Sequence, residues 1–80
     1  MTHLTVIQSH YLHAIIDLTR ELGMPPTMRE IGVHLGVKST NAISQALTRL
    51  ERQGLIRRKR NVARGLIVTP AGKHWENKTL

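Results

Sequence analysis

The feature that most constrains the fold of this 80-residue chain is a pair of helix signals separated by a very short turn. Residues 27–30, Thr-Met-Arg-Glu, form a capping box, in which the Thr and Glu side chains each accept a free backbone amide. Gly36 closes this segment, and Ser39 is the next good N-cap. The spacing predicts a short helix over 28–35, a tight turn and a longer helix over 40–53. This is the order of a helix-turn-helix motif.

A longer helix is predicted before this motif. Residues 5–8 form another capping box and Gly23 supplies a left-handed end, so we expect the first helix to lie between them. Its apolar residues recur at helical spacing. They are Ile7, Tyr11, Leu12, Ile15, Ile16, Leu18 and Leu22. Residues 24–26, Met-Pro-Pro, cannot be helical because a residue before proline is pushed to extended geometry. Ile7, Tyr11 and Leu12 could form either the core or a dimer seam, and we expect them to belong to the core.

After the third predicted helix the sequence changes to strand-forming residues. Residues 55–59 and 66–69 are rich in Leu, Ile and Val, and residues 60–65 connect them. Residues 70–80 form either a short C-terminal tail or a helical turn. The predicted fold class is mainly α with a small β-hairpin: a winged helix-turn-helix of three helices and a two-stranded wing, as a single domain over residues 1–80. The alternative is a generic small α+β domain whose hairpin only covers the core.

Length and composition restrict the possible classes of protein. Eighty residues suffice for one small domain. Its core must be aliphatic, because the chain has ten Leu, seven Ile and five Val but only one Trp, one Tyr and no Phe. The lack of cysteine excludes disulfides, thiolate metal sites and a Cys nucleophile. Apolar runs never exceed three residues, so we expect neither a membrane helix nor a signal peptide but a soluble, cytoplasmic, nucleoid-associated protein.

Positive charge is concentrated in the last third of the chain. The formal net charge is +7, and seven of the twelve Lys and Arg but one of the five acids lie within residues 57–80. Residues 57–60, Arg-Arg-Lys-Arg, form the densest block. Such a field favours a polyanion as partner. The alternative is an ordinary solvated surface run. A membrane surface fits less well, because no amphipathic helix with bulky aromatics follows the block.

The third predicted helix carries an unusual polar face. At 3.6 residues per turn, one side of this helix is apolar, formed by Ile43, Leu47 and Leu50. The polar residues that project away from it are Asn41, Gln45, Thr48 and Arg52. A solvated helix face ordinarily carries Glu and Lys pairs. This face offers amides, hydroxyls and Arg, the groups that pair with base edges, and the start of the second helix of a helix-turn-helix enters the major groove.

Many residues across the chain together form a family pattern. They are Gly23-Met24-Pro25-Pro26-Thr27, Glu30-Ile31, Leu35-Gly36, Ser39, Asn41-Ala42, Leu47, Leu50, Gly54-Leu55-Ile56 and Arg64-Gly65. Over roughly residues 5–68 the chain resembles the N-terminal DNA-binding domain of LexA-type repressors. The resemblance implies a winged helix-turn-helix that binds operator DNA and represses transcription, with Ser39, Asn41 and Ala42 among the base-reading residues.

The chain departs from this family in two respects. The family usually carries two acids where this chain has Ser44 and Gln45, and because an acid accepts a hydrogen bond from cytosine, we expect a different operator. The family's self-cleaving C-terminal domain, with its Ser–Lys pair and main dimerisation surface, has no counterpart in these residues. We therefore expect that control by self-cleavage is not available to this chain.

We predict two groups of contacts to double-stranded DNA. The base-reading residues are Ser39, Thr40, Asn41, Ala42, Ser44, Gln45 and Thr48. The residues that contact phosphate or belong to the wing are Thr27, Lys38, Arg49, Arg52, Arg58, Lys59, Arg60 and Arg64. One copy reads few base pairs, so we expect a homodimer on a two-fold site, formed either before or only upon DNA binding. The rival interpretation is a winged-helix module that binds or inhibits another protein.

Other kinds of site are not predicted. His10 and His13 are neighbours on the first helix, but no Cys or nearby acid offers a third metal ligand. The acids suit capping or surface pairing and no glycine-rich phosphate loop is present, so we expect no catalytic residues, no cofactor and no enzyme. RNA readers commonly use stacking aromatics, which this chain lacks. Trp75 packs on the first helix or anchors a partner chain.

Overall fold

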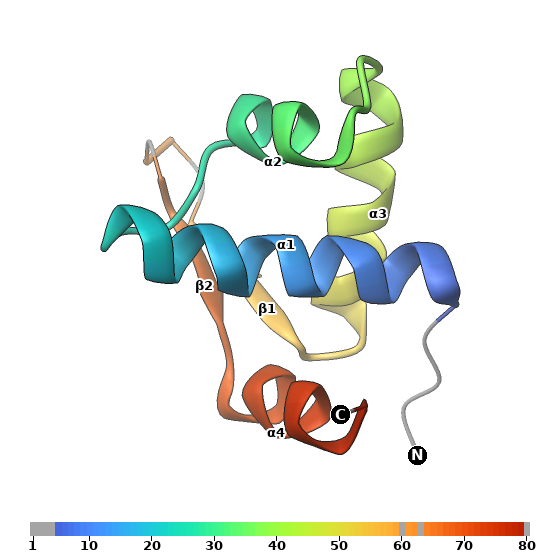
Figure 1. Ribbon diagram of the computed structural model, residues 1–80, viewed down its shortest axis with the longest axis vertical. Coiled ribbons are helices and arrows are strands. Elements are labelled where there is room, and N and C mark those ends of the chain that lie inside the picture. Colours follow the sequence, from blue (N-terminus) through green and yellow to red (C-terminus); the bar gives the residue numbers. More distant parts are fainter. Residues whose placement is uncertain (1–4, 60, 63, 80) are drawn as a thin grey trace.

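The computed structural model describes residues 5–59, 61–62 and 64–79, the last five of these by their backbone alone. The elements in chain order are α1 (Val6–Leu22), α2 (Met28–Leu35), α3 (Thr40–Arg52), β1 (Ile56–Arg58), β2 (Leu66–Val68) and α4 (Pro70–Thr79) (Figure 1). The two strands pair antiparallel, and we call these strands and the residues between them the wing. The predicted winged helix-turn-helix is thereby confirmed, with a further helix at its end.

Local capping explains where the first two helices begin and end. The hydroxyls of Thr5 and Thr27 accept the amides of Gln8 and Glu30, each at 3.1 Å, and both capping boxes are complete. Gly23 and Gly36 end these helices with φ near +70° (69° and 71°). A left-handed backbone of this kind costs glycine little.

The turn between α2 and α3 depends on a close backbone approach. The amide of Val37 donates to the carbonyl of Gly32 at 2.8 Å, which folds the chain back against α2. A Cβ on Gly32 would lie 2.7 Å from the carbonyl oxygen of Val37 and 2.9 Å from Cδ1 of Ile43. Glycine at this position therefore allows the turn to be tight.

Three element boundaries differ slightly from the prediction. The third helix ends at Arg52, one residue early, because Gly54 takes a left-handed conformation with φ +75°. The strands are shorter than predicted, yet their flanks remain bonded: the amide of Thr69 donates to Leu55 and the amide of Lys59 to Gly65, at 3.0 and 2.9 Å. The predicted ends of the wing are thus paired outside the regular ladder.

The C-terminal segment is a ten-residue helix, longer than the predicted tail or helical turn. The hydroxyl of Thr69 accepts the amide of Gly72 at 3.2 Å, and Pro70 occupies the first helical position, where its missing N–H costs nothing. A Cβ on Gly72 would collide with the backbone carbonyl of Leu55. Glycine therefore lets α4 approach the start of the wing. The side chain of Trp75 lies outside the described part of the structure.

The core is aliphatic, as predicted, and joins the helices to the wing. Its largest fully buried side chains are Pro26, which precedes α2, and seven residues from four elements: Leu12, Ile15, Ile31, Ile43, Leu47, Leu50 and Ile56. In Figure 1, α1 crosses in front of α3 and the strands and extends past them at both ends. Ile7 lies at one of these ends and is 66% exposed, so its assignment to the core was wrong. Leu22, at the other end, is 39% exposed. Among the described residues, no helix is long and apolar enough to cross a membrane.

Candidate nucleic-acid interface

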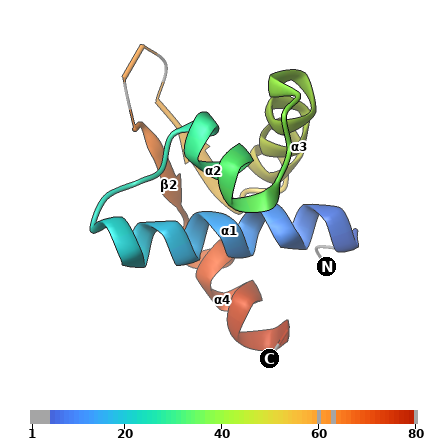
Figure 2. The same ribbon diagram turned by 45° about the horizontal axis from the view of Figure 1, so that its top comes forward.

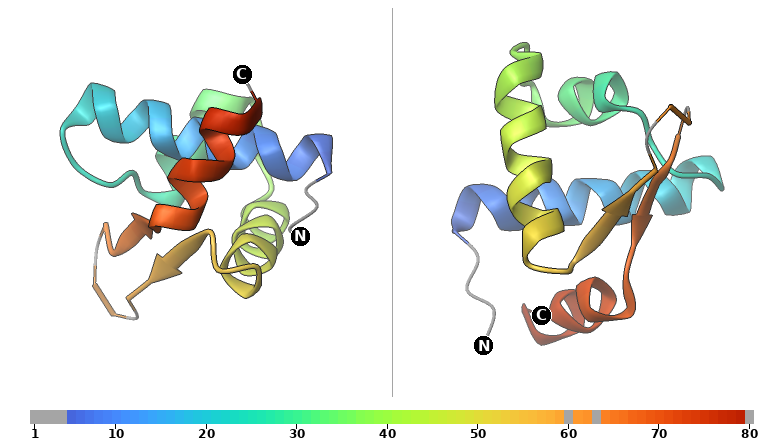
Figure 3. Two further views of the ribbon diagram at one scale, coloured as in Figure 1. Left: turned by 90° about the horizontal axis from the view of Figure 1, so that it is seen from below. Right: turned by 180° about the vertical axis from the view of Figure 1, so that it is seen from behind.

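The start of α3, helix α2 and the loop of the wing lie at one end of the molecule. Figure 2 shows α2 between the wing and α3. Seen from behind, the start of α3 and the loop of the wing point the same way, and α4 lies at the opposite end (Figure 3, right). The helix-turn-helix and the wing therefore present one continuous surface, which matches the arrangement that the sequence predicted.

The outer face of α3 is polar and exposed. Asn41 and Gln45 are exposed, whereas Ile43 and Leu47 on the other side are 2% and 1% exposed. The remaining exposed residues at the start of this segment are Lys38, Ser39, Thr40 and Ala42. The Ser39 hydroxyl accepts the amide of Ala42 at 3.2 Å and so acts as the N-cap. From Ser39 to Leu50 the chain has no acid, so the end of α3 that carries the positive dipole is free of carboxylates.

Thr48 and Ser44 differ from the other predicted base readers. Both are half-buried. The Thr48 hydroxyl donates to the carbonyl of Ser44 at 2.9 Å and accepts Nη2 of Arg58 at 3.0 Å. The hydroxyl of Thr48 therefore already has one donor and one acceptor within the protein. Through the donor, Arg58, it binds the wing to α3.

Arg58 is fastened to α3. Nη2 of Arg58 bonds to Thr48, and Nε of the same side chain lies 3.5 Å from Oε1 of Glu51. Both partners belong to the second half of α3, and Arg58 belongs to β1. The predicted wing cation Arg58 thus joins the wing to α3 through two of its nitrogens.

Arg64 is fastened to α2. Its Nη1 and Nη2 lie 2.7 and 3.0 Å from the two carboxylate oxygens of Glu30, and Nη1 also donates to the carbonyl of Pro25 at 3.0 Å. The Arg64 guanidinium, followed by the amide of Thr27, lowers the pKa of the Glu30 carboxyl to about 2. The same pairing raises the pKa of Arg64. This bidentate pair stabilises the charged forms of both groups.

The other predicted phosphate contacts are exposed or line the grooves beside α2. Arg49, Arg52 and Lys59 are exposed. Lys59, with Thr27, Arg58 and Arg64, lines the groove between α2 and the wing. Lys38 and Thr40 line the groove between α2 and α3. Arg60 lies outside the described residues.

Sequence reasoning missed Arg29. This exposed residue lines both grooves beside α2, so it lies between the wing and the start of α3. A signal was present in the sequence, because the first turn of a helix ordinarily favours an acid and disfavours a cation. Arg29 therefore adds a positive charge to the surface between the wing and the start of α3.

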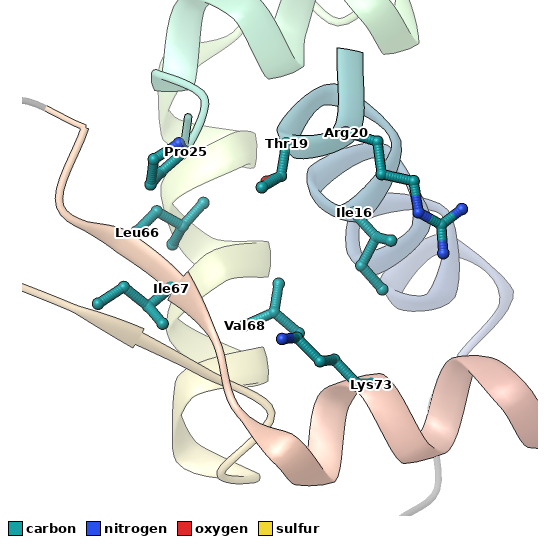
Figure 4. Close-up of a pocket in the computed structure, with 8 residues that line it drawn as sticks. All are labelled: Ile16, Thr19, Arg20, Pro25, Leu66, Ile67, Val68 and Lys73. Atoms are coloured by element: carbon teal, nitrogen blue, oxygen red, sulfur yellow. The ribbon is translucent and has the colours of Figure 1, made fainter. Parts of the chain in front are cut away.

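An apolar groove lies away from the surface formed by the helix-turn-helix and the wing. Ile16, Leu66 and Val68 line it between α1 and β2, with Arg20 and Lys73 beside them (Figure 4). Lys73 is an exposed lysine of α4. The position of Lys73 at the other end of the molecule makes it a suitable control for Lys59, the lysine of the wing.

Comparisons with known proteins point to one family. Residues 1–65 match the family model described as the LexA DNA binding domain. The chain is 44% identical over 66 residues to the LexA repressor of Sorangium cellulosum, covering 82% of this chain and 29% of that protein. It is 41% identical over 69 residues to the LexA repressor of Myxococcus xanthus, covering 86% and 31%. It is 39% identical over 72 residues to the LexA repressor of Geobacter metallireducens, covering 90% and 36%. The chain thus spans about a third of the length of these relatives.

Proposed function

The chain belongs to the family of LexA DNA-binding domains, and from this premise we propose that it is a sequence-specific regulator of transcription, acting as a repressor on double-stranded DNA. The observation that carries the proposal is the exposed, acid-free start of α3 beside a cationic wing. A carboxylate at this position would be repelled by phosphates unless it met cytosine, whereas the amides of Asn41 and Gln45 suit the edge of adenine.

In the proposed complex, the start of α3 enters the major groove. Asn41 and Gln45 read bases, with Ser39, Thr40, Ala42 and Ser44 close to the same edges. Helix α2 crosses the sugar–phosphate backbone, where Arg29 and Lys38 meet phosphates. Arg49, Arg52 and Lys59 contact the flanking backbone. These cations supply affinity without sequence information, while the start of α3 supplies specificity.

We further propose that two copies bind together. A single recognition helix reads only a few base pairs, which is too little for useful specificity. Two copies related by a two-fold axis would read two half-sites on one face of the duplex. Repression then follows from occupying the operator and excluding other proteins from it.

Selection of bound oligonucleotides from a random pool tests this function. We expect an enriched motif with two half-sites about one or more helical turns apart, roughly 10–10.5 base pairs each. An unenriched pool, despite binding at low salt, would contradict specific recognition. A protein captured equally well after nuclease treatment and by the Asn41→Ala variant would favour the rival protein-binding module.

A further inference from the structure

We propose that Arg64 is a positioning residue: paired with Glu30, it fixes the wing on the start of α2 and makes no contact with phosphate itself. This inference rests on the proposed function, since it concerns how the wing is presented to DNA. It differs from the simple expectation for an arginine in a basic hairpin, which is a phosphate contact.

The guanidinium of Arg64 is bonded to several acceptors within the protein. Arg64 makes three hydrogen bonds at 2.7–3.0 Å, two to Glu30 and one to Pro25, and all three acceptors lie at the start of α2 or just before it. The guanidinium has five N–H donors, of which these bonds use three. A turn of Arg64 toward a phosphate would break them and leave the Glu30 carboxylate without its partner, facing the DNA.

The carboxylate of Glu30, which accepts these bonds, is itself held in place by the capping box of α2. Oε1 of Glu30 also accepts the amide of Thr27 at 2.8 Å, and the Thr27 hydroxyl accepts the amide of Glu30 at 3.1 Å. The carboxylate is therefore part of the N-terminal cap of α2. Arg64, 34 residues later in the chain, bonds to a group whose position the helix already defines.

Arg64 precedes the residue that joins the two sides of the wing through its backbone. The next residue, Gly65, accepts the amide of Lys59 at 2.9 Å and donates to the carbonyl of Val62 at 3.2 Å. A Cβ on Gly65 would lie 2.8 Å from the carbonyl oxygen of Lys59, so the two strands approach closely here. The Arg64 pair therefore fixes the part of the wing that carries the exposed cation Lys59.

The substitution Glu30→Gln distinguishes the two roles by the sign of its effect. Glutamine retains the capping box, which accepts either Glu or Gln at this position, but it removes the charge that binds Arg64. If Arg64 positions the wing, Glu30→Gln weakens binding to the selected site several-fold. If Arg64 contacts phosphate, the loss of a nearby negative charge frees the arginine, and binding is unchanged or tighter. The latter result would overturn the proposal.

Two further variants make the experiment conclusive. Glu21→Gln removes one exposed negative charge from α1 and serves as the matched control, for which we expect no weakening. Arg64→Lys keeps the charge but loses the bidentate geometry, so a positioning role predicts that it binds about as weakly as Arg64→Ala. Binding by Arg64→Lys close to the unmodified protein, with Arg64→Ala weak, would indicate a phosphate contact and overturn the proposal.

Amide hydrogen exchange tests the same pair without DNA. In Glu30→Gln we expect faster exchange at the amide of Lys59, while the amide of Leu55, which donates to Leu50 at 3.0 Å, keeps its rate. Unchanged exchange at Lys59 would contradict the positioning role. Failure of the unmodified protein to bind any DNA specifically would instead contradict the proposed function, and the exchange result would still stand.

Discussion

The guanidinium of Arg58 donates from Nη2 to the hydroxyl of Thr48 at 3.0 Å, across ten residues of sequence, and so fastens β1 to α3. With the pair of Arg64 and Glu30 on α2, the wing is bound to both helices of the helix-turn-helix by arginines. Side-chain bonds therefore join the wing to both α2 and α3, and two cations that sequence reasoning assigned to DNA are engaged within the protein.

The bond between Thr48 and Arg58 predicts the effect of Thr48→Val. Valine has nearly the same shape but offers no acceptor, so the wing loses one of its bonds to α3. We expect affinity to fall by the same factor on the selected site and on random DNA, as measured by mobility shift at one salt concentration. A loss confined to the selected site would mean that Thr48 reads a base.

The pair of Glu30 and Arg64 predicts a difference in acid stability between the unmodified protein and Glu30→Gln. The pKa of Glu30 is lowered in the folded state from 4.5 to about 2. Its contribution to the free energy of unfolding is therefore fully present above about 4.5 and is lost as the pH falls toward about 2.

Urea unfolding at a series of pH values measures this difference. We expect the midpoint of the unmodified protein to fall more steeply than that of Glu30→Gln through this interval. The remaining acids, Asp17, Glu21, Glu51 and Glu76, are common to both proteins and cancel in the comparison. Parallel midpoints across the interval would contradict the pairing.

The close approach at Gly32 predicts that Gly32→Ala is destabilising. Alanine in a helix interior is ordinarily favoured over glycine by about 1 kcal/mol. Here its Cβ would lie 2.7 Å from the carbonyl oxygen of Val37, so the turn must shift, and overpacking of this kind costs about 1–3 kcal/mol.

Thermal unfolding checks this prediction against Val33→Ala in the same helix. Val33 is 79% exposed, and substitution at such a surface position usually changes stability by less than about 0.5 kcal/mol. A Gly32→Ala variant as stable as Val33→Ala would show that the turn tolerates a side chain.

The exposed wing lysine predicts a change in salt dependence. Removal of one phosphate contact makes the slope of log K against log salt shallower by about 0.9. We expect this change for Lys59→Ala and none for Lys73→Ala, which removes an exposed lysine at the other end of the molecule. Equal slopes for the two variants would place Lys59 away from the DNA backbone.

The parts of this fold that were predicted correctly depend on contacts close in sequence. The capping boxes at Thr5 and Thr27 join residues three apart, so the helix starts can be read from the residue types alone. The same kind of signal is present at Thr69 and Pro70, where the prediction of a tail or a helical turn falls short of the ten-residue α4.

The partners of the wing arginines could not be predicted in this way. Arg64 meets Glu30 across 34 residues and Arg58 meets Thr48 across ten, so these contacts exist only once the wing has folded back on the helices. Charge alone marks both arginines as DNA contacts. Periodicity, by contrast, was sufficient to predict that Asn41 and Gln45 face outward, because it depends only on the regular geometry of α3.

The most direct test of the account is the affinity of Asn41→Ala for the selected site and for random DNA at the same salt concentration. Asn41 is exposed, so its removal should leave the fold intact. We predict a loss of about 1–3 kcal/mol in binding to the selected site and an unchanged affinity for random DNA. Equal losses on both DNAs, or no loss on either, would contradict base reading by the start of α3.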